Sequence, residues 1–144
     1  MSGLQSGLSR RRSDPESFRA RGLSVSMSVQ DLDASVDWYC HAIGFVVDRT
    51  YEREGVTTGV ALKAGNVRLL LNQDDGARGR DRVKGVGMSL FFTTVQDVDA
   101  LAERIKAEGS TLEMEPSDTP WGTRAFRVRD PDGFMLVISS EAAV

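Results

Sequence analysis

A six-residue motif occurs twice in this chain and marks two similar halves. Val29-Gln30-Asp31-Leu32-Asp33-Ala34 recurs as Val95-Gln96-Asp97-Val98-Asp99-Ala100. In each half the motif follows an alternating run typical of a strand and precedes a run with helical spacing of apolar residues. The repeat is too long for a solenoid unit, so it indicates a duplicated module. Two such modules are predicted to face each other with their sheets across a shared concave surface.

Each half is predicted to run in the order strand, helix, strand, strand, strand. The first half has a strand from Gly22, a helix capped by Asp31 and ended by Gly44, and strands over 45–51, 57–62 and 67–72. The second has a strand over 88–95, a helix capped by Asp97 and stopped by Gly109, a strand over 111–115, and a hairpin. The predicted fold class is therefore α+β, with two βαβββ modules forming a half-barrel. One domain spans 21–140, with modules 21–72 and 86–140 and a charged, glycine-containing linker over 73–85.

The final hairpin carries a strong turn signal in Asp130-Pro131-Asp132-Gly133. If Arg129 pairs with Phe134, one face of the hairpin carries Arg124, Phe126, Val128, Met135 and Val137. A wall that mixes these side chains suits a ligand cavity better than bulk water. Turn formation accounts fully for the two aspartates, so they are not interpreted as a catalytic pair.

Composition narrows the classes of function. The net charge of −3 over 144 residues argues against general nucleic-acid binding, and no apolar run is long enough for a membrane span. The single Cys40 rules out an intramolecular disulfide and fits a cytoplasmic protein. Residues 1–20 are rich in Ser, Gly and Arg and are predicted to form a flexible tail.

Together these features resemble the vicinal oxygen chelate superfamily. The features are the paired βαβββ modules, the helix-start motif of each half, Pro120-Trp121-Gly122-x-Arg124, and the Asp-Pro-Asp-Gly turn. The superfamily includes glyoxalase I, extradiol dioxygenases, fosfomycin-resistance enzymes and bleomycin-resistance proteins. The resemblance covers about 22–140 and implies modules curled into a half-barrel, usually in a homodimer. It leaves the function open.

Enzymes of the superfamily generally hold a divalent metal with His, Gln or Glu on four strands. The positions that match the first ligand of each module are Ser24 and Leu90, and those that match the last are Leu70 and Val137. Aliphatic side chains offer no lone pair, and a neutral serine hydroxyl is a poor ligand. A shift by one residue along any of the strands does not supply a donor. The resemblance at these positions therefore implies no metal and no cofactor.

The other donors have simple structural explanations. His41 is interpreted as a helix-end residue and Cys40 as a small buried hydrophobe. Glu113 and Glu115 alternate on a strand, and a solvated strand face explains them better than an all-oxygen metal site.

What remains is a predicted apolar and aromatic cavity with a few polar groups. The predicted ligand-binding residues are Ser24, Ser26, Leu70, Asn72, Leu90, Phe92, Trp121, Arg124, Phe126 and Val137. Trp121 or Phe126 would stack a flat ring, and Asn72 and Arg124 would orient it. Two alternatives stay open: the aliphatic members fill the half-barrel as core, and Arg124 pairs with an acidic residue of the linker, Asp74 or Asp75.

The first functional hypothesis is a metal-free protein that binds a small aromatic or amphipathic molecule, as bleomycin-resistance proteins of this superfamily do. The alternative is a metal-dependent lyase, isomerase or dioxygenase whose ligands lie elsewhere in the sequence. A third is a pocket-bearing subunit that works beside a partner, with the Arg-rich tail as its contact. The expected partners are a small-molecule ligand and a second copy of the chain, with no nucleic acid and no membrane.

Overall fold

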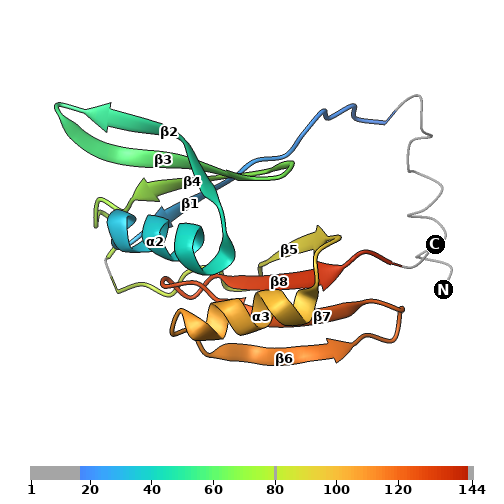
Figure 1. Ribbon diagram of the computed structural model, residues 1–144. Helices are drawn as coiled ribbons and strands as arrows, with labels where there is room; N and C mark the ends of the chain where they lie inside the picture. Colours follow the sequence, from blue (N-terminus) through green and yellow to red (C-terminus); the bar gives the residue numbers. More distant parts are fainter. Residues whose placement is uncertain (1–16, 80, 143–144) are drawn as a thin grey trace, which may run out of the picture.

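The computed structural model describes residues 17–79 and 81–142, so most of the predicted tail lies outside the described residues. The first module comprises β1 (Val25–Val29), α2 (Leu32–Trp38), the π-helical turn η2 (Tyr39–Ile43), β2 (Val46–Arg53), β3 (Val56–Ala64) and β4 (Val67–Gln73). The second comprises β5 (Ser89–Thr94), α3 (Val98–Ala107), β6 (Leu112–Asp118), β7 (Arg124–Arg129) and β8 (Met135–Ser140). The predicted α+β class with two βαβββ modules is confirmed (Figure 1).

Each module forms its own four-stranded mixed sheet. The strand orders are β1-β4-β3-β2 and β5-β8-β7-β6, and the described strands close no barrel. The first strand of each module pairs in parallel with the last, whereas the other pairs are antiparallel. Among the described strands, the edges are β1 and β2 in the first sheet and β5 and β6 in the second.

The repeated motif starts both helices in the same way. The Asp31 side chain accepts a hydrogen bond from the Ala34 amide at 3.1 Å, and the Asp97 side chain accepts one from the Ala100 amide at 3.2 Å. These bonds satisfy amide groups that a helix start leaves without a partner. The first helical segment ends at Gly44, whose φ of 108° is a conformation that favours glycine.

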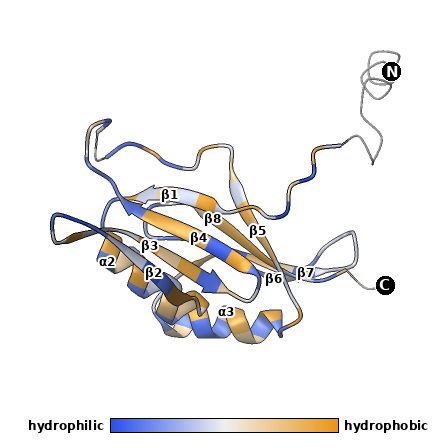
Figure 2. Cartoon of the chain, turned by 90° about the horizontal axis from the view of Figure 1, so that it is seen from above, coloured by the Kyte–Doolittle hydropathy of each residue, from blue (hydrophilic) through white to orange (hydrophobic). Residues whose placement is uncertain are grey.

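The two modules share one apolar core on the side that carries the helices. Figure 2 shows both helices along the same side of the strands. Tyr39 packs edge-to-face on Phe45, and Phe45 packs on Phe92 of the second module with ring centroids 6.1 Å apart. Leu71 and Leu136, one from each sheet, belong to the same buried cluster. The prediction that the sheets of one chain face each other across a concave surface is therefore wrong, because the modules meet through their helix-bearing faces.

The register of the β7–β8 hairpin differs by one residue from the prediction. Asp130 pairs with Phe134, since the Asp130 amide donates to the Phe134 carbonyl at 2.9 Å, and Arg129 pairs with Met135. The loop is thus a three-residue one, in which Gly133 has a φ of 94°. A one-residue change exchanges the two faces of a strand. Phe126 and Val128 therefore share their face with Leu136 and Ile138, not with Met135 and Val137.

The hairpin turn docks onto the first module, so turn formation is an incomplete explanation of its aspartates. The Tyr39 hydroxyl donates to Asp130 Oδ2 at 2.6 Å in a buried environment. Asp132 Oδ2 accepts hydrogen bonds from the Gln30 amide at 2.8 Å and from Lys84 Nζ at 3.1 Å. Burial, followed by the Asp130 carboxylate, raises the pKa of Tyr39 far above its usual value. Burial also raises the pKa of Asp130, although the Tyr39 hydroxyl and two backbone amides oppose that shift.

Lys84 extends this contact into the linker. Its side chain is buried, and Nζ lies 3.0 Å from Asp74 Oδ2 as well as 3.1 Å from Asp132 Oδ2. Arg82 Nη1 lies 2.7 Å from the same Asp74 oxygen. The contacts of this oxygen are ion pairs, because their angles are not those of a hydrogen bond. The Gly76 amide and these cations hold the pKa of Asp74 at about 2. We call Tyr39, Asp74, Lys84, Asp130 and Asp132 the module clamp.

The clamp predicts a difference between two Tyr-to-Phe changes. Tyr39→Phe leaves a buried carboxyl of Asp130 without its hydroxyl partner, which should cost about 1 to 3 kcal/mol of unfolding free energy. Tyr51→Phe is the control, because Tyr51 is 44% exposed and should change stability by less than about 0.5 kcal/mol. Urea denaturation measures both. Equal losses for the two variants would contradict the importance of the clamp.

Candidate functional site

The predicted site residues of the first sheet lie together. Ser26, Leu70 and Asn72 share the face opposite the helices, where Ser26 pairs with Leu70 and Asn72 Nδ2 donates to Ser26 Oγ at 2.8 Å. Ser24 lies just before β1 and is exposed. We call this side of each sheet its helix-free face. On the first sheet it is predominantly polar, with the Asn72 amide, several hydroxyl groups, and the cations Lys63 and Arg68, which both pair with Asp48.

The predicted site residues of the second sheet are divided between its two faces. Leu90, Phe92 and Phe126 pack in the shared core on the helix side, which supports the alternative that such residues fill the interior. Val137 lies on the helix-free face. The structure therefore does not bring these four residues to one surface.

Two residues that the sequence analysis missed flank Val137 on the helix-free face. Phe91 is its partner on β5, and Arg127 is its partner on β7. Phe91 is 57% exposed, and the Arg127 side chain makes no ion pair with any described residue. A three-residue loop ending in Gly133 was the sequence signal that would have placed Arg127 here, whereas the position of Phe91 follows from the parallel β5–β8 pairing.

Trp121 and Arg124 lie near the β6–β7 connection. Trp121 is 65% exposed, as expected for a rim position. Arg124 binds the Asp99 carboxylate through Nε and Nη2 at 2.7 and 2.9 Å, and Asp118 lies 3.1 Å from Nη1. The suggested pairing of Arg124 with Asp74 or Asp75 is wrong. The hydrogen bonds that Arg124 donates to Asp99 and Asp118 raise its pKa and occupy its donors.

The residues present do not fit the metal that the superfamily implies. The four expected positions carry Ser24, Leu70, Leu90 and Val137, and the observed pairing puts Phe91 rather than Leu90 beside Val137. Over residues 17–79 and 81–142, no group of three or more His, Cys, Asp or Glu side chains is arranged to hold a metal ion. The chemistry of these side chains therefore gives no basis for a metal-centred step.

The remaining donors are placed much as the sequence analysis expected. Burial and the nearby Asp37 raise the pKa of the half-buried Cys40, which disfavours its thiolate. Glu115 accepts hydrogen bonds from Lys106 Nζ, and Glu113 lies 3.6 Å from Arg129 Nε. Both glutamates are exposed strand residues with a basic neighbour.

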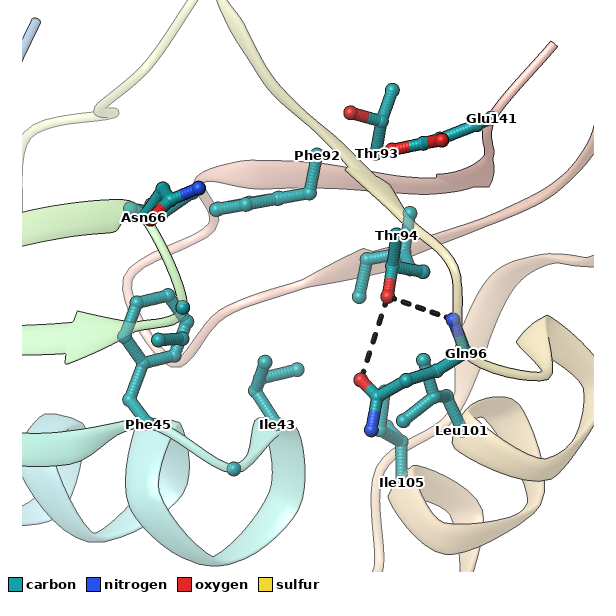
Figure 3. A pocket seen from close by; sticks show the side chains of 15 residues that line it. Ile43, Phe45, Asn66, Phe92, Thr93, Thr94, Gln96, Leu101, Ile105 and Glu141 are labelled. Atoms are coloured by element: carbon teal, nitrogen blue, oxygen red, sulfur yellow. Dashed lines mark hydrogen bonds between the residues drawn. The ribbon is translucent and has the colours of Figure 1, made fainter. Parts of the chain in front are cut away.

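A cavity of about 540 Å³ lies on the helix side, where the two modules meet (Figure 3). Its walls come from the end of η2, from the β3–β4 turn, from the end of β5, from α3 and from β8, and they include polar as well as apolar residues. Of the ten predicted site residues, Phe92 alone lines it.

In the described part of the chain no helix is long and apolar enough to cross a membrane.

A family model decides the relationship of the chain to known proteins. Residues 23–138 match the model of the Glyoxalase/Bleomycin resistance protein/Dioxygenase superfamily. The chain belongs to this superfamily. Lactoylglutathione lyase GLX1 of Arabidopsis thaliana is 27% identical over 126 residues, which are 83% of this chain but 44% of that protein. The chain thus spans less than half the length of the plant relatives it matches.

A bacterial relative is more similar in length. A probable lactoylglutathione lyase of Vibrio cholerae is 29% identical, over 81% of this chain and 87% of that protein. Among solved structures, TioX from Micromonospora sp. ML1 has a TM-score of 0.69 at 22% identity and covers 84% of this chain and 98% of its own. TnmS3, an antibiotic-binding protein from Streptomyces sp. CB03234, has a TM-score of 0.68 at 22% identity, covering 88% and 100%. These structures establish the superfamily fold.

Neighbouring residues on β5 test the assignment of the two faces in this superfamily member. Leu90→Ala should cost about 2 to 4 kcal/mol of unfolding free energy, because Leu90 is 8% exposed and packs in the core. Phe91→Ala should cost less than about 1 kcal/mol despite the larger deletion, because Phe91 is on the helix-free face. Chemical denaturation of both variants checks this. The opposite order would show that Leu90 faces away from the core.

Proposed function

We propose that this protein is a metal-free member of its superfamily that binds and sequesters a small aromatic or amphipathic compound. The observation that carries the proposal is the side-chain chemistry at the four expected metal positions, which are one hydroxyl and three aliphatic groups. Glyoxalase and extradiol dioxygenase chemistry needs a Lewis-acidic or redox metal to hold vicinal oxygens. Binding without chemistry needs only a shaped surface and a few polar groups.

Assembly of two copies would not change this conclusion. Each copy supplies the same Ser24, Leu70, Leu90 and Val137, so a site built across two chains still has no imidazole or carboxylate at these positions. The same holds if Phe91 replaces Leu90, as the β5–β8 pairing requires.

The proposed binding surface is formed by the helix-free faces of the two sheets. The first sheet contributes hydroxyl and amide groups around Asn72, and the second contributes Phe91 and Arg127, which flank the buried Val137. Phe91 offers an aromatic ring for stacking, and the guanidinium of Arg127 offers donors that other described side chains do not use. An amphipathic planar molecule matches this combination.

We further propose that the working form is a homodimer. β1 and β5 are sheet edges among the described strands, and exposed edges are available for pairing. Met88 and Val86 are exposed apolar residues just before β5. Covering these side chains with a second copy would bury apolar surface and bring helix-free faces of different chains close to each other.

The second candidate is a metal-dependent lactoylglutathione lyase. The names of the plant and Vibrio relatives favour it at 27% and 29% identity. It requires metal donors at positions other than the four expected ones. The antibiotic-binding name of TnmS3 favours the first candidate at a lower identity of 22%.

One experiment separates the two candidates. The protein is titrated with bleomycin and with a water-soluble anthraquinone while tryptophan fluorescence is followed, with and without EDTA. Binding of at least one of them is expected with a Kd below about 100 μM, and EDTA should not change it, because no metal contact is involved. In parallel, isomerisation of the methylglyoxal–glutathione hemithioacetal is followed by absorbance after addition of Ni²⁺ or Zn²⁺.

No metal-dependent isomerisation is expected in that assay. Turnover that appears with metal and disappears with EDTA would contradict the proposal and support the lyase. Failure of both aromatic probes to bind would contradict sequestration of a planar compound.

A further inference from the structure

We propose that Tyr51, Gly59 and Asn72 form a subsite that accepts a hydrogen bond from a planar ligand, so that the bound compound carries an N–H or O–H group at the edge of its ring. This inference rests on the proposed function, because the three residues lie on the helix-free face of the first sheet. It adds a chemical class for the ligand and two residues that the predicted site does not include, Tyr51 and Gly59.

The three residues form one row across three neighbouring strands. Tyr51 of β2 pairs with Gly59 of β3, and Gly59 pairs with Asn72 of β4. Residues that pair directly point to the same face of a sheet, so the side chains of Tyr51 and Asn72 lie on either side of a position that has none. In Figure 1 this face is turned away from α2 and from the second module, which leaves it open to a ligand.

The Asn72 amide is held with its oxygen toward Gly59. On one side, Nδ2 donates a hydrogen bond to Ser26 Oγ of β1 at 2.8 Å. On the other side, Oδ1 lies 3.1 Å from the place that a Cβ atom on Gly59 would take. The amide therefore extends across the surface of the sheet and fills space that a side chain on Gly59 would need. No described residue donates a hydrogen bond to Oδ1, so this acceptor is available to a ligand.

Tyr51 supplies an aromatic surface beside this acceptor. Its Cδ2 atom lies 3.7 Å from the same Cβ position, and the residue is 44% exposed. A planar ligand that packs against Tyr51 can donate from its edge to Asn72 Oδ1. An aromatic surface beside one oriented polar group is the combination that fixes the orientation of a small ligand. Because the free group is an acceptor, it selects a ligand edge that presents a donor.

The position of the amide requires glycine at Gly59, whereas the backbone there does not. The φ of Gly59 lies outside the left-handed region that favours glycine, unlike that of most other described glycines. Glycine in the interior of a strand also weakens the strand. An alanine would keep the backbone conformation, but its methyl group would displace Asn72 Oδ1 by a few tenths of an ångström. The missing side chain thus serves the placement of the acceptor.

The test uses two probes that differ by one methyl group, 2-quinolone and 1-methyl-2-quinolone. The first has a lactam N–H, and the second has a methyl group on the same nitrogen. Each is titrated into the ¹⁵N-labelled full chain, and the backbone amides and the Asn72 side-chain NH₂ group are followed by NMR. The N–H probe should bind about three- to tenfold more tightly, because methylation removes one hydrogen bond, and it should shift the signals of Gly59 and of the Asn72 NH₂ group.

Gly59→Ala should reduce this preference to less than about twofold, because the acceptor is displaced, while the variant remains as stable as the parent in urea. Gly22→Ala is the matched control and should leave the preference unchanged. The φ of Gly22 is also outside the left-handed region, and nothing lies within 4 Å of the place that its Cβ would take. Ser26→Ala, which removes the partner of Asn72 Nδ2, should also reduce the preference, and Ser26→Thr, which keeps a hydroxyl group, should restore it.

Three outcomes would overturn this inference and leave the proposed function standing. They are equal binding of the two quinolones, an equal effect of Gly59→Ala and Gly22→Ala, and absence of quinolone binding by a protein that binds bleomycin or the anthraquinone. Failure of all these planar probes to bind would overturn the inference together with the proposed function.

Discussion

The contact between the hairpin turn of the second module and the residues that flank the two ends of α2 is the constraint on which the arrangement of the modules depends. Asp130 and Asp132 are separated from their partners Tyr39 and Gln30 by most of the chain, yet the atoms lie 2.6 and 2.8 Å apart. Lys84 adds the linker to the same point. A buried carboxyl group is costly without partners, so this contact forms correctly only when both modules are in place.

The clamp determines which surfaces remain for function. It joins the modules on their helix-bearing sides, where one core contains side chains of both sheets. The helix-free faces are consequently left for contacts with a ligand or with another chain. A cavity of about 540 Å³ lies beside this core at the far end of β8, and Phe45 and Phe92 are among the residues that line it.

Sequence patterns were sufficient for the order of helices and strands in each module, but not for the way in which the two modules meet. The motif at Asp31 and Asp97 located both helix starts, and alternation located the strands, because capping and alternation are local properties. The hairpin register was missed by one residue, since the loop length depends on the left-handed conformation of Gly133. That single difference moved Phe126 to the core and replaced it with Arg127 beside Val137. Two further features depend on packing between elements: which face of β5 turns to the core, and which residues pair with Arg124. Local sequence patterns do not determine such packing.

The central claim is that this superfamily member works without a metal, and metal loading tests it most directly. The protein is purified without a metal-binding tag, exposed in turn to Zn²⁺, Ni²⁺, Mn²⁺ and Fe²⁺, dialysed, and analysed by mass spectrometry for bound metal. Because the four expected positions offer one serine and three aliphatic side chains, less than about a tenth of an equivalent of each metal should remain. Retention of a stoichiometric, tightly held metal would contradict the account and indicate a metalloenzyme with other ligands.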